Sequence, residues 1–368
     1  MRYLDEERLR EFRRFYGELE ERENVFYLFF TTGLLHWVCK SLQFVPATVP
    51  VVLIGSGLSG EEREWVHENL GRPFFCFPET VDEGIVWDYL FAVNTSDFGW
   101  LDIDCFVLNP KIFDEMTEIR KSDSMNCIWS YDYGLRTEPR SRFSFPVVRT
   151  FFLFVNQNVI QRLNRTRQSW SPRPFLWEEA PSSSSFKRYS TFHLLPEVHK
   201  ENLARILPMD SCGNAIFPVQ EIKKDGVVTR HLDTMVLYQL LAHEAGYRLR
   251  QVRRLDEDGT AMTDEVIHVG SISYYRSFGN PDYETVNEEE RSKYREIYER
   301  VLLLDYLIAG QFHQELPKYY SVYKRMLERE IRQLGKPLEG VLEEAVSRMT
   351  DEGLSRESAL RICSGGRP

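Results

Sequence analysis

Two aspartates one residue apart, Asp102 and Asp104, lie inside an otherwise apolar stretch at residues 98–110. The apolar residues around the pair predict a strand that is buried on both faces of a sheet. Burial of an unpaired carboxylate is costly, so two of them in one such strand need a compensating positive charge. Where the strand ends, both side chains can emerge at the sheet edge and share a divalent cation. Oxygen ligands suit a hard cation such as Mg²⁺ or Mn²⁺, so the pair predicts a metal site.

The elements that must position this pair alternate between strand and helix along the first 110 residues. Strands are expected at 25–30, 50–54, 74–77 and 98–110, and helices at 34–44, from residue 59, and at 82–93. This alternation is typical of an α/β protein with a doubly wound, mostly parallel sheet, in which ligands bind outside the carboxyl ends of the strands. Thr31, Thr32 and Gly33 follow the first strand and are therefore candidate ligand-binding residues. The chain has neither a GxGxxG nor a GxxxxGK[ST] motif, so dinucleotide and P-loop sites are unsupported.

The segments before and after this α/β region are predicted to be helical. Residues 3–22 carry apolar side chains at helical spacing and predict an amphipathic helix, and the chain is helical in character from residue 288 onward. Residues 165–225 are expected to be irregular. We therefore predict an N-terminal helix (1–23), a central α/β domain (24–285) and a C-terminal helical extension (286–368).

The composition is that of a soluble globular protein, with 42% hydrophobic and 28% charged residues among 368. The formal net charge of −10 argues against general affinity for nucleic acid. The six cysteines are scattered without a CxxC pair, which favours reduced thiols in a cytoplasmic protein. The first residues lack the apolar stretch of a signal peptide, and His36, Lys40 and two prolines interrupt the most apolar region, so no membrane span is predicted.

Residues 83–110 resemble the Asp-x-Asp segment of the GT-A-fold nucleotide-sugar glycosyltransferases, and residues 266–270 look like the His-x-Gly motif found late in several such families. The resemblance covers roughly residues 25–280 and implies a GT-A-like (Rossmann-like) mixed α/β sheet. It implies that residues 24–285 form the catalytic domain, with a nucleotide-binding half (24–125) and an acceptor half (126–285). It also implies that Asp102 and Asp104 bind a Mn²⁺ or Mg²⁺ ion that holds the donor's diphosphate, with Asp102 also contacting the nucleotide. In this family pattern the cation neutralises the leaving phosphate as the glycosidic bond breaks.

The same resemblance suggests roles for four further residues, each with a structural alternative. His268 is a third metal ligand through a neutral ring nitrogen, or else a core histidine. Asp233, before an apolar helix, is the carboxylate beside the acceptor hydroxyl, or else an ordinary helix N-cap. As a functional group it would be the general base of an inverting enzyme, or in a retaining enzyme it would orient the acceptor or stabilise positive charge at the sugar carbon. Asp88 is a nucleotide contact, or else a surface carboxylate. The pattern's lysine is replaced by Ser273, and Arg276 is the candidate that supplies the missing positive charge to the diphosphate.

Three functions follow from these observations. The first is a metal-dependent, hexosyltransferase-like glycosyltransferase that moves a sugar from a UDP- or GDP-sugar to an unidentified acceptor, namely a sugar, a small molecule or a protein. The second is a sugar nucleotidyltransferase, which ordinarily has a Gly-rich basic loop after its first strand, unlike the sequence at 31–34. The third is an inactive nucleotide-sugar-binding module. Association of two copies through the C-terminal helices is left open.

Overall fold

The protein divides into two units, each assembled from three separate segments of the chain. Unit one comprises residues 1–24, 82–99 and 115–255, and unit two comprises residues 25–81, 100–114 and 256–368. The computed structural model describes residues 4–81, 83–122, 125–130, 148–166, 175–179, 189–190, 220–224, 227–232, 235, 238–239, 242, 245–251, 263–270, 272 and 288–365. The domain limits expected from the sequence stay predictions.

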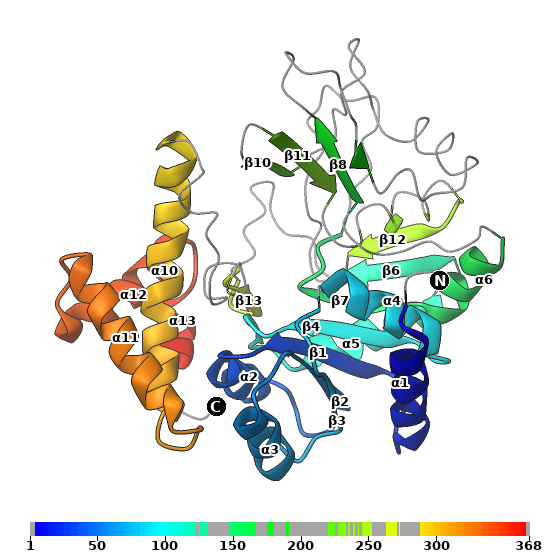
Figure 1. Cartoon of the computed structure of the whole chain (residues 1–368), viewed down its shortest axis with the longest axis horizontal. Helices are drawn as coiled ribbons and strands as arrows, with labels where there is room; N and C mark the ends of the chain where they lie inside the picture. Colours follow the sequence, from blue (N-terminus) through cyan, green and yellow to red (C-terminus); the bar gives the residue numbers. More distant parts are fainter. Residues whose placement is uncertain are drawn as a thin grey trace. The chain divides into compact units, whose positions relative to one another are not determined.

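Unit one contains the helices α1 (Glu6–Glu18), α4 (Glu83–Val93), most of α5 (Lys111–Ser122) and α6 (Gln157–Thr166). Its strands β12 (Arg248–Gln251), β6 (Asn126–Ser130) and β7 (Phe152–Val155) are neighbours in that order, with β12 parallel and β7 antiparallel to β6. A second, antiparallel sheet has the order β10 (Gln220–Lys224), β11 (Val227–Leu232), β8 (Phe175–Glu179) and β9 (Tyr189–Ser190) (Figure 1). The prediction of an irregular segment at 165–225 is wrong at β8, β9 and β10, which are regular strands.

The predicted N-terminal helix is confirmed as α1. Asp5 caps it by accepting a hydrogen bond from the Arg8 amide at 2.8 Å. Its apolar residues recur at helical spacing, so one face buries Phe12 and Tyr16 within unit one. The Tyr16 hydroxyl lies 3.1 Å from the Thr95 hydroxyl, beyond the end of α4.

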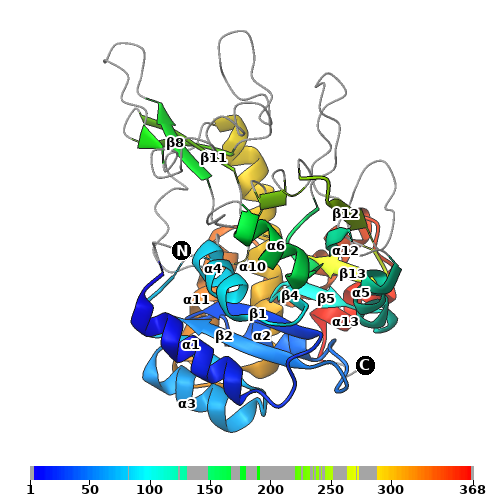
Figure 2. The same ribbon diagram turned by 90° about the vertical axis from the view of Figure 1, so that its right-hand side faces the viewer.

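Unit two carries the parallel core of the fold. The strand order is β4 (Phe98–Asp102, of which residues 100–102 belong to this unit), β1 (Val25–Thr31), β2 (Val51–Ser56) and β3 (Phe74–Phe77). β2 runs parallel to both β1 and β3, and Figure 2 shows β1 and β2 side by side. The helices α2 (Leu35–Leu42) and α3 (Gly60–Asn69) connect these strands. The predicted mixed α/β class, with mostly parallel strand pairs, is confirmed.

The apolar stretch around the two aspartates is not one strand, as the sequence suggested. β4 ends at Asp102, the chain turns, and β5 (Cys105–Val107) pairs antiparallel with β13 (Val266–His268) in a separate two-stranded sheet. Because β5 is also fully buried, its residues are apolar too, and the apolar stretch of the sequence continues past the turn. Composition alone therefore gave no sign of the break.

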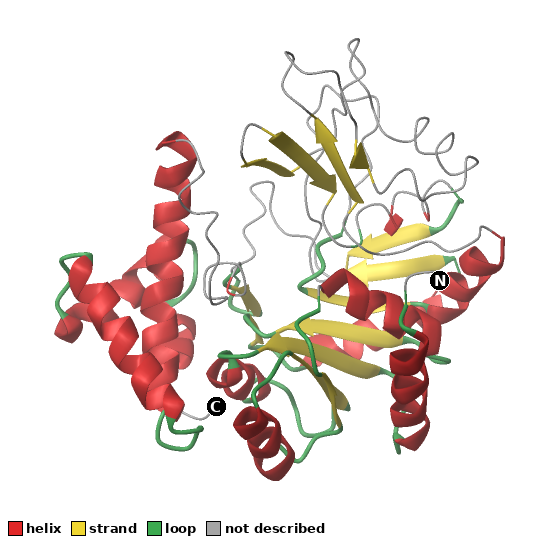
Figure 3. Cartoon of the chain, viewed as in Figure 1, coloured by secondary structure: helices red, strands yellow, loops and turns green. Residues whose placement is uncertain are grey.

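The C-terminal part of unit two is helical, as predicted, and Figure 3 shows it in red. It consists of α10 (Glu288–Phe312), α11 (Tyr319–Gln333), a 3₁₀ turn (Leu338–Gly340), α12 (Val341–Asp351) and α13 (Arg356–Cys363). Among the described residues, no helix combines the length and the apolar character needed to cross a membrane.

Buried polar groups join these helices to α2. Asp305 of α10 is fully buried, and its Oδ1 lies 2.5 Å from His36 Nε2 and accepts from Trp37 Nε1 at 2.8 Å, while Oδ2 accepts from the Tyr323 hydroxyl at 2.5 Å. A buried carboxylate is tolerated when several donors satisfy it. The C-terminal helices are therefore attached to α2 by directional bonds as well as by apolar contact.

Candidate metal centre

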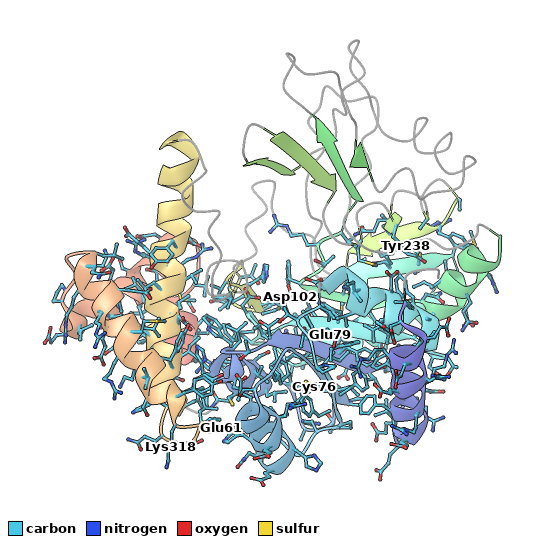
Figure 4. The ribbon with its side chains drawn as sticks, in the orientation of Figure 1. Glu61, Cys76, Glu79, Asp102, Tyr238 and Lys318 are labelled. Atoms are coloured by element: carbon cyan, nitrogen blue, oxygen red, sulfur yellow. The ribbon has the colours of Figure 1, made fainter. Side chains whose placement is uncertain are left out.

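Asp102, Asp104 and His268 bring one ligand atom each to a common point in unit two. These atoms all lie within 4.8 Å of one another. His268 Nε2 is 3.5 Å from Asp104 Oδ1 and 3.7 Å from Asp102 Oδ2, which is longer than a usual N–H···O hydrogen bond. The side chain of Asp104 is 7% exposed, that of His268 19% and that of Asp102 26% (Figure 4 labels Asp102). Asp104 is thus the most buried of the three side chains, and Asp102 is the most exposed.

The break between β4 and β5 is what assembles this group. Asp102 is the last residue of β4, and Asp104 lies in the turn that follows. In the β5–β13 pair, His268 stands opposite Cys105, the residue after Asp104. The Val269 amide then donates to the Asp104 carbonyl at 3.0 Å, which continues the pairing past the strand end. Strand pairing therefore places His268 beside an aspartate that is distant in sequence.

The carboxylate of Asp102 is oriented by a neighbouring indole. Trp100 is 1% exposed, and its Nε1 donates to Asp102 Oδ1 at 2.6 Å. Because alternate residues of a strand share a face, Trp100 and Asp102 project to the same side of β4. The other oxygen, Oδ2, is the one nearer His268. Hydrogen bonds of this kind commonly fix the geometry of metal-binding carboxylates.

The pKa of the Asp104 carboxyl lies below its ordinary value, although burial by itself raises it. The attraction of the His268 ring and hydrogen bonds that include the Ile272 amide, which donates to Oδ2 at 3.4 Å, outweigh burial. Burial and the two nearby carboxylates raise the pKa of the Cys105 thiol well above its usual range. Asp104 is thus ionised at neutral pH, whereas Cys105 is a neutral core thiol.

Gly270 satisfies a local backbone requirement next to the centre. Its φ is +78°, a conformation that residues with a side chain rarely adopt, and a Cβ built there would stand 3.7 Å from the His268 ring. The glycine lets the chain turn after His268, so that the Ile272 amide reaches Asp104. This gives the His-x-Gly spacing a physical reason in this chain.

The predicted ligand-binding turn after β1 is organised by a residue that sequence analysis missed. Glu62 is fully buried, and it accepts from the Thr32 hydroxyl at 2.7 Å and from the Gly33 amide at 2.8 Å. It also completes a capping box with Ser59 at the start of α3, and it accepts from the Tyr320 hydroxyl of α11 at 3.1 Å. Burial raises the pKa of Glu62, but its hydrogen bonds outweigh this and hold the pKa below the ordinary value. The serine cap and acidic first turn predicted the helix that contains Glu62, but local spacing gave no sign that Glu62 contacts the turn after β1.

The other predicted site residues are not brought to this centre by any described contact. Thr31 ends β1 in unit two, and its part in donor binding stays a prediction. Asp88 is a half-buried residue of α4 in unit one, and its role also stays a prediction. Asp233 and Arg276 lie outside the described residues, so their predicted roles are untested.

Parts of this chain are similar to known proteins. Residues 2–160 match a family model described as the StrH glycosyltransferase N-terminal domain. Together with the relative described next, this match defines the protein as a glycosyltransferase, which confirms the class predicted from the sequence.

A characterised protein with a similar sequence is the dTDP-dihydrostreptose–streptidine-6-phosphate dihydrostreptosyltransferase of Streptomyces griseus. It is 26% identical in an alignment of 289 positions, which covers 72% of this chain and 71% of the relative. Among solved structures, a cytidylyltransferase from Leptospira borgpetersenii is 14% identical over 40% of this chain and 66% of that one, with a TM-score of 0.27. The glycosyltransferase GlyE of Streptococcus pneumoniae is 11% identical over 40% of this chain and 38% of its own, with a TM-score of 0.25. Structural likenesses this slight do not define a fold.

Proposed function

We propose that this glycosyltransferase moves a sugar from a nucleoside diphosphate donor to a hydroxyl of its acceptor, and that it depends on a divalent cation. The observation that carries this proposal is the convergence of Asp102, Asp104 and His268 in unit two. The match of residues 2–160 to a glycosyltransferase family gives that convergence its chemical context.

The three side chains fit a small divalent cation. Two carboxylate oxygens and one imidazole nitrogen form a donor set that suits Mn²⁺, and Mg²⁺ with additional oxygen ligands. Separations of 3.5 and 3.7 Å between His268 Nε2 and the carboxylate oxygens leave room for an ion between atoms that do not bond closely to one another. A cation held there would offset the negative charge of a diphosphate leaving group.

The protein's own groups prepare this centre before any donor binds. Asp104 stays ionised because His268 and backbone donors stabilise its charge. Trp100 holds one oxygen of Asp102, which leaves the other oxygen facing His268. The arrangement is preorganised, so less ordering accompanies donor binding.

The remaining roles are proposals of the same kind. We assign Thr31, Thr32, Gly33 and Asp88 to donor binding, Arg276 to the diphosphate, and Asp233 to the acceptor hydroxyl. The named relative uses a dTDP-sugar and a phosphorylated small-molecule acceptor. We therefore add dTDP-sugars to the UDP- and GDP-sugars expected from the sequence, and place dTDP-sugars first.

A donor screen tests this function. The protein is incubated with dTDP-, UDP- and GDP-sugars in the presence of Mn²⁺ or Mg²⁺, and release of the nucleoside diphosphate is measured. We expect slow, metal-dependent hydrolysis of one donor, which Asp104→Asn abolishes while the melting temperature is retained. Asp351→Asn, at the exposed end of α12, is the matched control and should behave like the wild type.

The same screen separates the alternatives. Absence of nucleoside diphosphate release from every donor contradicts the proposal. Pyrophosphate release from a nucleoside triphosphate and a sugar 1-phosphate identifies a nucleotidyltransferase instead. Tight donor binding without turnover, even with acceptors added, identifies an inactive binding module.

A further inference from the structure

An arginine of the C-terminal helices reaches the segment that carries His268. Arg300 of α10 donates through Nη2 to the carbonyl oxygen of Val269 at 2.7 Å. The amide of the same residue, Val269, donates to the Asp104 carbonyl at 3.0 Å. The peptide groups that immediately follow His268 are therefore held from both sides, by the Asp104 turn and by α10.

Arg300 is itself held in one orientation. Its Nη1 lies 2.8 Å from each carboxylate oxygen of Glu352, the C-cap residue that follows α12. The side chain of Arg300 is 18% exposed and that of Glu352 36%, so water competes only partly for this pair. Because a guanidinium group is planar and its donors form a rigid fork, fixing Nη1 also fixes the direction of Nη2. Glu352 thus directs Arg300 onto the Val269 carbonyl.

The other end of β13 is attached to the same helices. Asp264 precedes the strand and accepts from the Ser355 amide at 3.0 Å and from its hydroxyl at 2.8 Å. Ser355 is the N-cap of α13. β13 has only three residues and a single partner strand, and a two-stranded pair is marginally stable by itself. The C-terminal helices supply the additional bonds at both ends of this short strand.

We propose that Arg300 is a positioning residue for the metal centre, and that it acts through His268. By fixing the Val269 peptide, the Arg300–Glu352 pair keeps His268 Nε2 directed at Asp102 and Asp104. The C-terminal helices thereby form part of the metal-binding unit. This inference rests on the proposed function only in requiring that the centre bind a divalent cation.

Titration of the full chain with Mn²⁺ alone, without a donor, tests the inference. Outer groups that orient metal ligands typically change metal affinity by about 10–100-fold when they are removed. Since Arg300 acts through a neighbouring peptide, we expect Arg300→Gln to weaken Mn²⁺ binding by roughly tenfold, the low end of that range. Arg300→Lys should have a smaller effect, because lysine keeps the positive charge but has a single nitrogen in place of Nη1 on Glu352 and Nη2 on the Val269 carbonyl.

Arg348→Gln is the matched control. Arg348 lies on α12 and pairs with Glu299 and Glu344 at 2.7 and 3.0 Å, but no described contact joins it to β13. Arg300→Gln removes one arginine–carboxylate pair from the C-terminal helices and Arg348→Gln removes two, so the control should lower the melting temperature at least as much. Only Arg300→Gln should change Mn²⁺ affinity. An equal loss of affinity in both variants would mean general loosening of the helices and would overturn the proposal.

Repeating the substitution in a His268→Ala variant tests whether Arg300 acts through His268. In His268→Ala, Mn²⁺ binding through the two aspartates should be weaker, and adding Arg300→Gln should produce no further loss. A tenfold loss of Mn²⁺ affinity on adding Arg300→Gln both to the wild type and to His268→Ala overturns the role of Arg300. Wild-type Mn²⁺ affinity in folded Arg300→Gln and Arg300→Lys overturns it as well. Either result leaves the metal centre intact. If the wild type itself fails to bind Mn²⁺, the metal dependence in the proposed function fails, and this inference fails with it.

Discussion

Replacing Trp100 by phenylalanine isolates the hydrogen bond that orients Asp102. The variant keeps an aromatic ring in a position that is 1% exposed, but it loses the indole donor that lies 2.6 Å from Asp102 Oδ1. We expect weaker Mn²⁺ binding, because the carboxylate must then be ordered when the ion binds.

The magnitude follows from the exposure of the acceptor. A hydrogen bond to a charged group contributes about 1.5–3 kcal/mol. Asp102 is 26% exposed, so water can replace part of the lost bond, which favours the lower end of that range. About 1.4 kcal/mol corresponds to a tenfold change in a dissociation constant. We therefore expect Mn²⁺ affinity to fall roughly tenfold, within the range known for groups that orient metal ligands.

Calorimetric titration with Mn²⁺ measures this effect, and urea unfolding confirms that the variant is folded. Trp87→Phe is the control, because Trp87 is also buried and its indole also donates to a carboxylate, that of Glu83 at 3.2 Å. We expect this control to lose some stability and to keep its Mn²⁺ affinity. Affinity within twofold of the wild type in folded Trp100→Phe would refute the orienting role of the indole.

Three further predictions concern buried charges in unit two. Burial lowers the pKa of Lys40 to about 8, so the folded protein releases this proton at a lower pH than the unfolded chain does. The stability of the wild type relative to Lys40→Met should therefore rise by about 2 kcal/mol between roughly pH 7 and 9.5, as measured by urea unfolding. Glu62→Gln removes an acceptor of several hydrogen bonds and should destabilise the protein at neutral pH. Because hydrogen bonds hold the pKa of Glu62 below its ordinary value of 4.5, the difference in stability from the wild type should be full above that value and shrink as the pH falls below it; a difference as large at about pH 3 as at pH 7 would contradict this. Asp305→Asn leaves buried donors without their charged acceptor and should cost about 3–5 kcal/mol in thermal or urea unfolding, and a loss below 1 kcal/mol would show that the network is dispensable.

Local patterns in the sequence determined the elements of the fold. Strand β3 was predicted with its observed limits, and Glu288 was predicted as the start of the C-terminal helices. These predictions succeeded because apolar periodicity, caps and acidic first turns are properties of neighbouring residues. Asp102 and Asp104 were also identifiable, since charged residues inside an apolar stretch conflict with the cost of burial.

The tertiary structure alone decided how those elements form a site. The antiparallel pairing of β13 with β5 placed His268 beside Asp104. Hydrogen bonds from the C-terminal helices join Arg300 of α10 to Val269 and Tyr320 of α11 to Glu62. Partners such as these come from distant segments, and neither hydrophobic periodicity nor residue spacing records which distant group will satisfy a given donor. The metal centre was therefore predictable as a set of residue types, whereas the network that orients it emerged only when strands and helices far apart in the chain were packed together.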